Sequence, residues 1–142
     1  MSSNRGARFR DFVALNLQAH KVLPETDERD LIGNGIAAFK LDGAQARGMV
    51  AVMAGEGDRI LASDVSRSML NVLHQLGGKR GAIGKRQFDK AVVILKALVK
   101  GHITDAHARA WVKRLVEQGE FKIRGRGLFR RRRWFRKIKP VA

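Results

Sequence analysis

The sequence predicts a mainly α-helical fold, a compact bundle of about six helices followed by a short C-terminal β-ribbon or basic tail. Three observations predict it. Apolar residues recur at helical spacing as far as Gly119, and caps and glycine stops separate these stretches. From Phe121 onward, apolar and basic residues alternate instead. With 142 residues, 44% of them hydrophobic, the chain is long enough to bury a core.

Three helices are expected in the first half of the chain, at about residues 8–20, 26–39 and 42–54. In the first, Phe9, Val13 and Leu17 fall on one stripe. Thr26 follows Pro24 closely and is the expected N-cap of the second helix. The third helix begins with Asp42-Gly-Ala-Gln45, which is typical of a capping box.

Three more helices are expected in the second half, at about residues 63–77, 87–100 and 104–119. Thr104 is followed by Asp105 at the start of the last one, and Gly119 ends it. The glycine-rich, basic stretch Gly77–Arg86 predicts a loop. Beyond Gly119, the alternating pattern predicts a two-stranded ribbon or an extended tail.

Charge is unevenly distributed along the chain. Lys and Arg number 29 against 13 Asp and Glu, which gives a net charge of +16. We divide the chain into a charge-neutral helical scaffold or dimerisation part (1–78), a basic helical part of the same domain (79–120) and an Arg-rich ribbon or tail (121–142) with ten basic and no acidic residues. This asymmetry indicates a polyanionic partner, nucleic acid before anionic lipid.

The candidate nucleic-acid contacts are the cations of the second half and one aromatic residue. Arginine has a planar guanidinium that suits phosphates and guanine edges, and the interleaved aromatic rings suit either stacking on bases or packing on the domain. The candidates are Lys79, Arg80, Lys85 and Arg86 in the expected loop, Arg109, Lys113 and Arg114 in the helix at 104–119, and Lys122, Arg124, Arg126, Arg130, Arg131, Arg132, Arg133, Trp134, Arg136, Lys137 and Lys139 after it.

Residues 104–129, TDAHARAWVKRLVEQGEFKIRGRGLF, resemble the end of a winged helix-turn-helix domain. In the resemblance, Leu115, Val116 and Gly119 close a recognition helix, and Phe121–Phe129 form a hairpin wing with RGRG at its tip. The resemblance covers about residues 87–135. It implies DNA binding, with Arg109, Lys113 and Arg114 on the helix face toward DNA.

A faint internal repeat at an offset of 80 residues aligns the segments AHKVLPETDERDLI and VKGHITDAHARAWV. Each segment predicts a helix, a polar turn and a second helix. The pair resembles the helical-pair repeat of the tellurite-resistance TerB-like domains over about residues 9–119. The second turn keeps only Asp105 of the acidic cluster that this family has, so the resemblance implies no acid-dependent metal site here.

No catalytic or metal-binding pattern is present. The chain has no cysteine. The stretch Gly77–Arg86 fails the phosphate-binding GxxxxGK[ST] pattern, and Gly81-Ala-Ile-Gly84 looks like the GXXG loop of a KH domain without that domain's sheet pattern. His102 and His107 lie five residues apart, the wrong phase for one helix face. We therefore expect a non-enzymatic protein without cofactor or metal.

We interpret the chain as a regulatory or architectural DNA-binding protein. Its basic second half is expected to contact the phosphate backbone and to read a groove of the DNA. Two alternatives stay open: RNA or ribosome binding through the same arginines, and a TerB-like interaction protein that docks on an anionic membrane. A homodimer formed through the neutral half is also left open. The chain begins without the apolar region of a secretory signal, so a cytoplasmic, nucleoid-associated location is expected.

Overall fold

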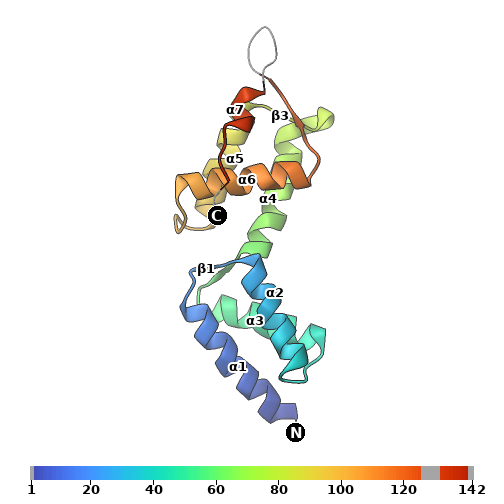
Figure 1. Ribbon diagram of the computed structural model, residues 1–142, viewed down its shortest axis with the longest axis vertical. Helices are drawn as coiled ribbons and strands as arrows, with labels where there is room; N and C mark the ends of the chain where they lie inside the picture. The colour runs from blue at the N-terminus through green and yellow to red at the C-terminus, as the bar shows by residue number, and fades with distance from the viewer. Residues whose placement is uncertain (1, 126–131, 141–142) are drawn as a thin grey trace. The chain divides into compact units, whose positions relative to one another are not determined.

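The computed structural model describes residues 2–125 and 132–140, which are mainly helical, as the sequence predicts (Figure 1). The chain divides into two compact units, Met1–Asp64 (unit 1) and Val65–Ala142 (unit 2). The boundary between the two units falls inside helix α4 (Ala62–Gly77). Within the described ranges, no helix combines the length and the apolar character needed to cross a membrane.

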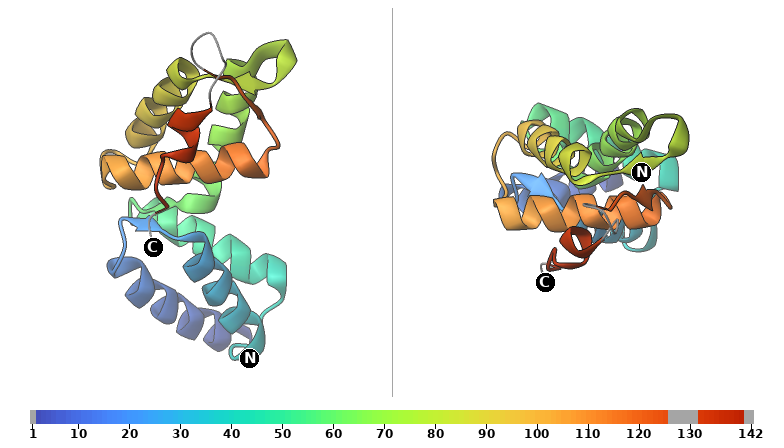
Figure 2. Two further views of the ribbon diagram at one scale, coloured as in Figure 1. Left: turned by 45° about the horizontal axis from the view of Figure 1, so that its top comes forward. Right: turned by 90° about the horizontal axis from the view of Figure 1, so that it is seen from above.

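Unit 1 is a small helical group held together at one end by two paired strands. Its elements are α1 (Ser2–Gln18), β1 (Val22–Leu23), α2 (Glu25–Ala37), α3 (Gly43–Glu56) and β2 (Ile60–Leu61). Helix α3 packs against both α1 and α2 (Figure 2), and β1 pairs with β2 in parallel. The core is formed by Phe9, Val13, Leu17, Leu23, Leu31, Leu41, Ala46, Val50, Ala54 and Leu61.

Unit 2 continues α4 and adds a second helical group. Its further elements are η1 (Gly78–Arg80), β3 (Ala82–Ile83), α5 (Lys85–Leu98), α6 (Asp105–Gln118), β4 (Lys122–Ile123) and the short α7 (Arg133–Arg136). Helices α5 and α6 pack together, and β3 pairs with β4 in parallel. The largest fully buried side chains are Met69, Leu73, Ile83, Phe88, Val92, Leu95, Val99 and Val112.

Side-chain caps mark the start of helices α3 and α6, but not that of α2. The predicted capping box at α3 is confirmed, because Asp42 Oδ1 accepts from the Gln45 amide at 2.7 Å and Gln45 Oε1 accepts from the Asp42 amide at 3.2 Å. Thr104 Oγ1 accepts from the amide of His107 at the start of α6. The predicted cap at Thr26 is wrong: α2 begins after Pro24, which makes no side-chain cap, so Thr26 already lies inside the helix.

Apart from η1 and α7, which have no counterpart in unit 1, the two units repeat the same order of elements: helix, strand, helix, helix, strand. Strand β3 and helix α5 follow β1 and α2 at an offset of 60 residues, and α6 and β4 follow α3 and β2 at 62, not at the predicted offset of 80. Equivalent contacts recur, since the Ile60 amide donates to the Lys21 carbonyl at 3.0 Å and the Lys122 amide to the Gly81 carbonyl at 2.9 Å.

The described part of the C-terminus does not form the predicted hairpin ribbon. Lys122 and Ile123 pair in parallel with Ala82 and Ile83, which precede α5, whereas a hairpin would pair them with the residues that follow. The predicted wing tip falls partly in residues 126–131, outside the described residues. The predicted loop before α5 contains η1 and β3. The chain turns between them at Gly81, which has a φ of 59°, a conformation that glycine adopts without strain.

Candidate nucleic-acid interface

Nearly all of the excess positive charge belongs to unit 2. Its sequence has 21 Lys and Arg against four Asp and Glu, whereas unit 1 has eight against nine. All of the residues predicted to contact nucleic acid therefore lie in unit 2. Because Coulomb attraction to a polyanion follows the local density of cations, the strongest attraction is expected where these side chains gather around a concave surface.

A groove of about 880 Å³ lies on unit 2 at the start of α5. Four of its lining side chains are cationic and one is acidic; we call the former the groove cations: Lys85, Arg86, Lys90 and Arg124. The acid is Asp89, whose carboxylate lies 3.6 Å from Lys85 Nζ and thus offsets one charge. Arg86, Lys90 and Arg124 are exposed and have no ion pair among the described residues.

Strand pairing brings the groove cations together from distant parts of the sequence. Lys85 and Arg86 stand in the first turn of α5, and Lys90 follows Arg86 one turn later on the same face. Arg124 comes directly after β4, and its amide donates to the Ile83 carbonyl at 2.8 Å, two residues before α5. The parallel pairing of β3 with β4 therefore places Arg124 beside the helix start.

Gly84 allows this close approach. A Cβ at this position would lie 2.7 Å from Gln87 Oε1 and 3.5 Å from the Cβ of Arg124. Gln87 Oε1 accepts from the Gly84 amide at 3.1 Å, which satisfies a main-chain donor at the helix start. Glycine thus leaves room for the cap and the Arg124 side chain.

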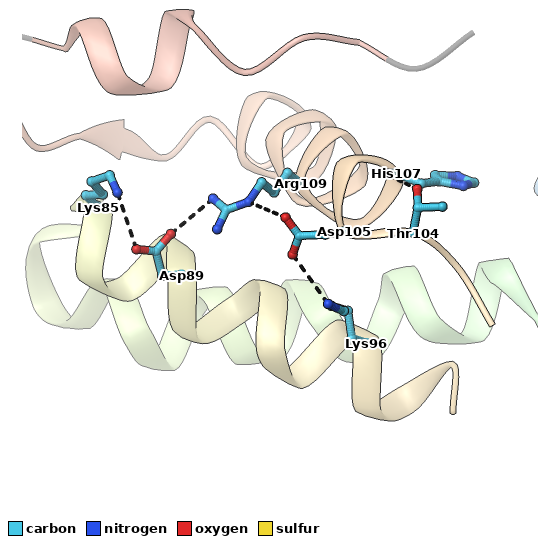
Figure 3. A network of polar contacts seen from close by, with 7 residues as sticks. All are labelled: Lys85, Asp89, Lys96, Thr104, Asp105, His107 and Arg109. Carbon is cyan, nitrogen blue, oxygen red and sulfur yellow. Dashed lines mark hydrogen bonds and ion pairs between the residues drawn. The ribbon is translucent and has the colours of Figure 1, made fainter. Parts of the chain in front are cut away.

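Arg109 is engaged inside unit 2 by two carboxylates (Figure 3). Its Nη1 lies 3.2 Å from Asp89 Oδ1, and its Nε lies 2.9 Å from Asp105 Oδ2. Lys96 Nζ lies 3.4 Å from the other oxygen of Asp105. Hydrogen bonding from Arg109 lowers the pKa of Asp105, and the reciprocal bond raises the pKa of Arg109. The predicted DNA-facing Arg109 therefore joins α5 to α6.

Lys113 and Trp134, two further candidates, contact the C-terminal segment and the protein surface. Lys113 Nζ donates to the Ile138 carbonyl at 2.9 Å and lies 5.3 Å from the centre of the Phe135 ring. Trp134 Nε1 donates to the Arg124 carbonyl at 3.1 Å, and its ring is half-buried against Phe88. Both side chains hold the segment in place.

The other candidates are exposed where the structure describes them. These exposed candidates are Lys79, Arg80, Arg114, Lys122, Arg132, Arg133, Arg136, Lys137 and Lys139. Arg126, Arg130 and Arg131 lie outside the described residues. Sequence analysis missed Lys90, although its spacing of four from Arg86 on an expected helix is a signal that could have placed both on one face.

The equivalent surface of unit 1 has the opposite charge. At the offset of 60 residues, Glu25 and Asp30 take the places of Lys85 and Lys90 at the start of α2, and Thr26 takes the place of Arg86. The shared order of elements does not by itself produce a cationic groove. At the start of this helix, the difference in charge between the two surfaces lies in a few side chains on the first turns.

The function of this surface is indicated neither by a metal-binding cluster among the described residues nor by similarity to a known protein. Over residues 2–125 and 132–140, no three His, Asp or Glu side chains are grouped so that they could hold a metal ion. Comparisons of the chain with protein-family models, with curated proteins and with solved structures give no match. The resemblances to winged helix-turn-helix and TerB-like domains therefore stay predictions, and the groove is the feature from which a function is inferred.

Proposed function

We propose that this chain is a non-enzymatic DNA-binding protein that contacts the phosphate backbone through the cationic surface of unit 2. The groove at the start of α5 is the observation that supports the proposal most directly, because it gathers four cations around one acid. Phosphate contacts by Lys and Arg supply most of the affinity of sequence-independent DNA binding. A regulatory or architectural role is compatible with such binding.

The internal ion pairs of unit 2 support the same proposal. Asp89 and Asp105 are two of the four acids of unit 2, and both are occupied by Arg109, Lys85 or Lys96. The remaining groove cations have no protein carboxylate to neutralise them within the described ranges. Bringing a phosphate polymer into the groove would relieve the repulsion between like charges and release counterions from the nucleic acid.

Binding of a short labelled DNA duplex to the full chain, measured by fluorescence anisotropy over a range of salt concentrations, tests the proposal. In the groove variant, glutamine replaces all four groove cations. The matched control removes the same charge from exposed cations of unit 1 through Arg5→Gln, Arg8→Gln, Lys21→Gln and Arg29→Gln. The slope of log affinity against log salt should decrease by about 0.9 for each phosphate that the variant no longer neutralises.

We expect the groove variant to weaken binding and flatten this slope, and the control variant to bind as the unchanged chain does. Equal losses in both variants would mean that net charge alone drives association, and would overturn the proposal. Competition with structured RNA and with vesicles containing anionic lipid completes the test. Stronger competition by either than by unlabelled duplex DNA would reject DNA as the favoured partner.

A further inference from the structure

Two hydrogen bonds and a set of ring contacts hold residues 132–140, which we call the anchored segment, on the surface of unit 2. The Trp134 indole donates to the main-chain carbonyl of Arg124 at 3.1 Å. Lys113 Nζ donates to the carbonyl of Ile138, near the other end of the segment. The aromatic rings of helix α7, which belongs to this segment, pack on Phe88 of α5. The Lys113 ammonium of α6 lies over the Phe135 ring, and the ribbon of α7 runs next to α6 in Figure 2.

The aromatic rings of the segment pack against the protein and each other. Phe88 of α5 is fully buried, and the ring centres of Trp134 and Phe135 lie 5.4 and 6.3 Å from its own, both in edge-to-face geometry. Trp134 and Phe135 are themselves 5.7 Å apart. Edge-to-face pairs of this kind are favourable beyond the area they bury. These rings therefore form an anchor in which each of them already has partners.

The groove next to this anchor offers no surface on which a base could stack. Its lining contains glycines, cations, Gln87, Asp89 and two aliphatic side chains, Val93 and Ile94, but no aromatic residue among those that the structure describes. Stacking on aromatic rings is what proteins use to bind single strands without sequence preference. A groove that lacks such rings and is rich in cations suits contact with the phosphate backbone instead.

The anchor joins the segment to the wall of the groove. Arg124 lines the groove with its side chain and accepts the Trp134 hydrogen bond with its carbonyl. Arg132 and Arg133, both exposed, directly precede Trp134 in the chain. Arg136 and Lys137 are also exposed on the segment. The Trp134 hydrogen bond thus ties the segment that carries these cations to a residue of the groove wall.

From this arrangement we infer that Trp134 is a positioning residue, which holds the segment cations beside the groove so that both bind one phosphate backbone. The inference rests on the proposed function and deepens it. The ligand is a phosphodiester polymer that is recognised by its backbone. Duplexes of unrelated sequence are therefore expected to bind with equal affinity. Trp134 contributes to the affinity without touching a base; of the two roles that the sequence leaves open for it, stacking on bases and packing on the protein, its contacts favour the second.

A double-mutant cycle on the full chain tests the inference, with binding to duplex DNA as the readout. The segment-neutral variant replaces the exposed cations around Trp134 through Arg132→Gln, Arg133→Gln, Arg136→Gln and Lys137→Gln. Trp134→Ala is made in the unchanged chain and in this variant. Every phosphate that is no longer neutralised should lower the salt slope by about 0.9, so release of the segment should lower it by up to about 3.6.

We expect Trp134→Ala to weaken binding and flatten the slope in the unchanged chain, and to have little further effect in the segment-neutral variant, because the residue acts through those cations. Equal losses in both backgrounds would mean that Trp134 contacts the nucleic acid directly, and would overturn the inference. No loss in either background would overturn it as well. Trp134→Phe keeps the ring packing but not the hydrogen bond to Arg124, and should give an intermediate loss.

Tryptophan fluorescence supplies a second readout, in the full chain carrying Trp111→Phe so that Trp134 is the sole indole. An anchored indole should keep its emission when single-stranded or duplex DNA binds, whereas stacking on a base would quench it and contradict the inference. The failure of the proposed function and the failure of this inference can be told apart. If the groove variant binds DNA no more weakly than its unit 1 control, the proposed function is rejected. If the groove variant does bind more weakly, but Trp134→Ala has the same effect in both backgrounds or DNA quenches the Trp134 emission, only the positioning role of Trp134 is rejected.

Discussion

The indole Nε1 of Trp111 donates a hydrogen bond to the hydroxyl oxygen of Ser66 at 2.9 Å, and both side chains are buried. This contact joins α6 to α4 inside unit 2. It satisfies the polar end of a large aromatic side chain that otherwise packs among apolar residues. A buried donor with its own partner costs little, whereas the same donor without one is strongly destabilising.

We therefore expect Ser66→Ala to lower the free energy of unfolding by about 1–3 kcal/mol, because the Trp111 indole N–H would stay buried without an acceptor. Ser68→Ala is the matched control, since Ser68 lies on the same helix and is exposed. Urea denaturation of both variants measures the difference. Equal stability of the two variants would show that the hydrogen bond contributes nothing.

Gly35 lies where α2 meets Phe9 and Ala46, and we expect Gly35→Ala to destabilise unit 1. A Cβ there would lie 2.9 Å from the Phe9 ring and 3.0 Å from the Ala46 methyl, an overpacking that typically costs about 1–3 kcal/mol. Gly33→Ala on the same helix meets no atom within 4 Å and should stabilise by up to about 1 kcal/mol. Thermal unfolding of the two variants should therefore shift in opposite directions.

The ion pairs of Asp105 make stability depend on pH in the acidic range. Hydrogen bonding from Arg109 lowers the pKa of Asp105 below its ordinary value of 3.8 in the folded state. A lowered carboxyl pKa contributes stability that is fully present above the unfolded value and is lost as the pH falls through the folded value. Asp105→Asn should therefore destabilise at neutral pH, and the difference should disappear in strong acid.

This pH profile is checked by urea denaturation from neutral pH to below pH 3.8. Glu117→Gln is the control, because Glu117 lies on the same helix, is exposed and has no ion pair within the described ranges. Both carboxylates of the network are partly exposed, so the effect at neutral pH should be small, as for surface ion pairs in general. A constant difference between Asp105→Asn and the unchanged chain at every pH would contradict this explanation.

Two lysines of α5 should differ in their effect on DNA binding. Lys90 lines the groove without an ion pair among the described residues, whereas Lys96 is bound to Asp105. Lys90→Gln should lower the salt slope of binding by about 0.9, the amount for one phosphate contact, and Lys96→Gln should lower it less. Salt titrations of both variants measure this. Identical slopes would mean that neither its place in the groove nor its lack of an ion pair gives Lys90 a larger part in binding.

The helices of this fold could be predicted because their signals are local. Asp42 and Gln45 lie three residues apart, and a capping box needs nothing beyond that spacing. The strands could not be predicted in the same way. Lys122 and Ile123 form a strand of two residues, too short for an alternating pattern, and their partners Ala82 and Ile83 lie about 40 residues earlier.

The candidate site was predictable in its composition but not in its geometry. Charge counting found Lys85, Arg86 and Arg124, but only the pairing of β3 with β4 brings them to one groove. Arg109 and Lys113 were predicted to contact nucleic acid because they are cationic, and the resemblance to a winged helix-turn-helix implied that they face DNA. Their actual partners, two carboxylates and a main-chain carbonyl, come from other elements and from the preceding turn of α6, which periodicity cannot show.

The correct internal repeat was also present in the sequence. Ala44-Gln-Ala-Arg47 and Ala106-His-Ala-Arg109 match at an offset of 62, at the same place in α3 and α6. Four residues are too few to distinguish this alignment from the competing one at 80. The structure distinguishes them, because left-handed main-chain conformations at Asp58 and Glu120 occupy the same place after each helix.

The recurrence of one element order in two units of opposite local charge separates what the backbone requires from what its surface carries. Both units bury an apolar interior, while surface side chains at matching positions differ in sign, as Glu25 and Lys85 illustrate. We therefore expect the outer side chains of the first helical turns to be exchangeable without loss of the fold. Cations placed at Glu25 and Asp30 would test whether unit 1 tolerates the surface charge that unit 2 carries.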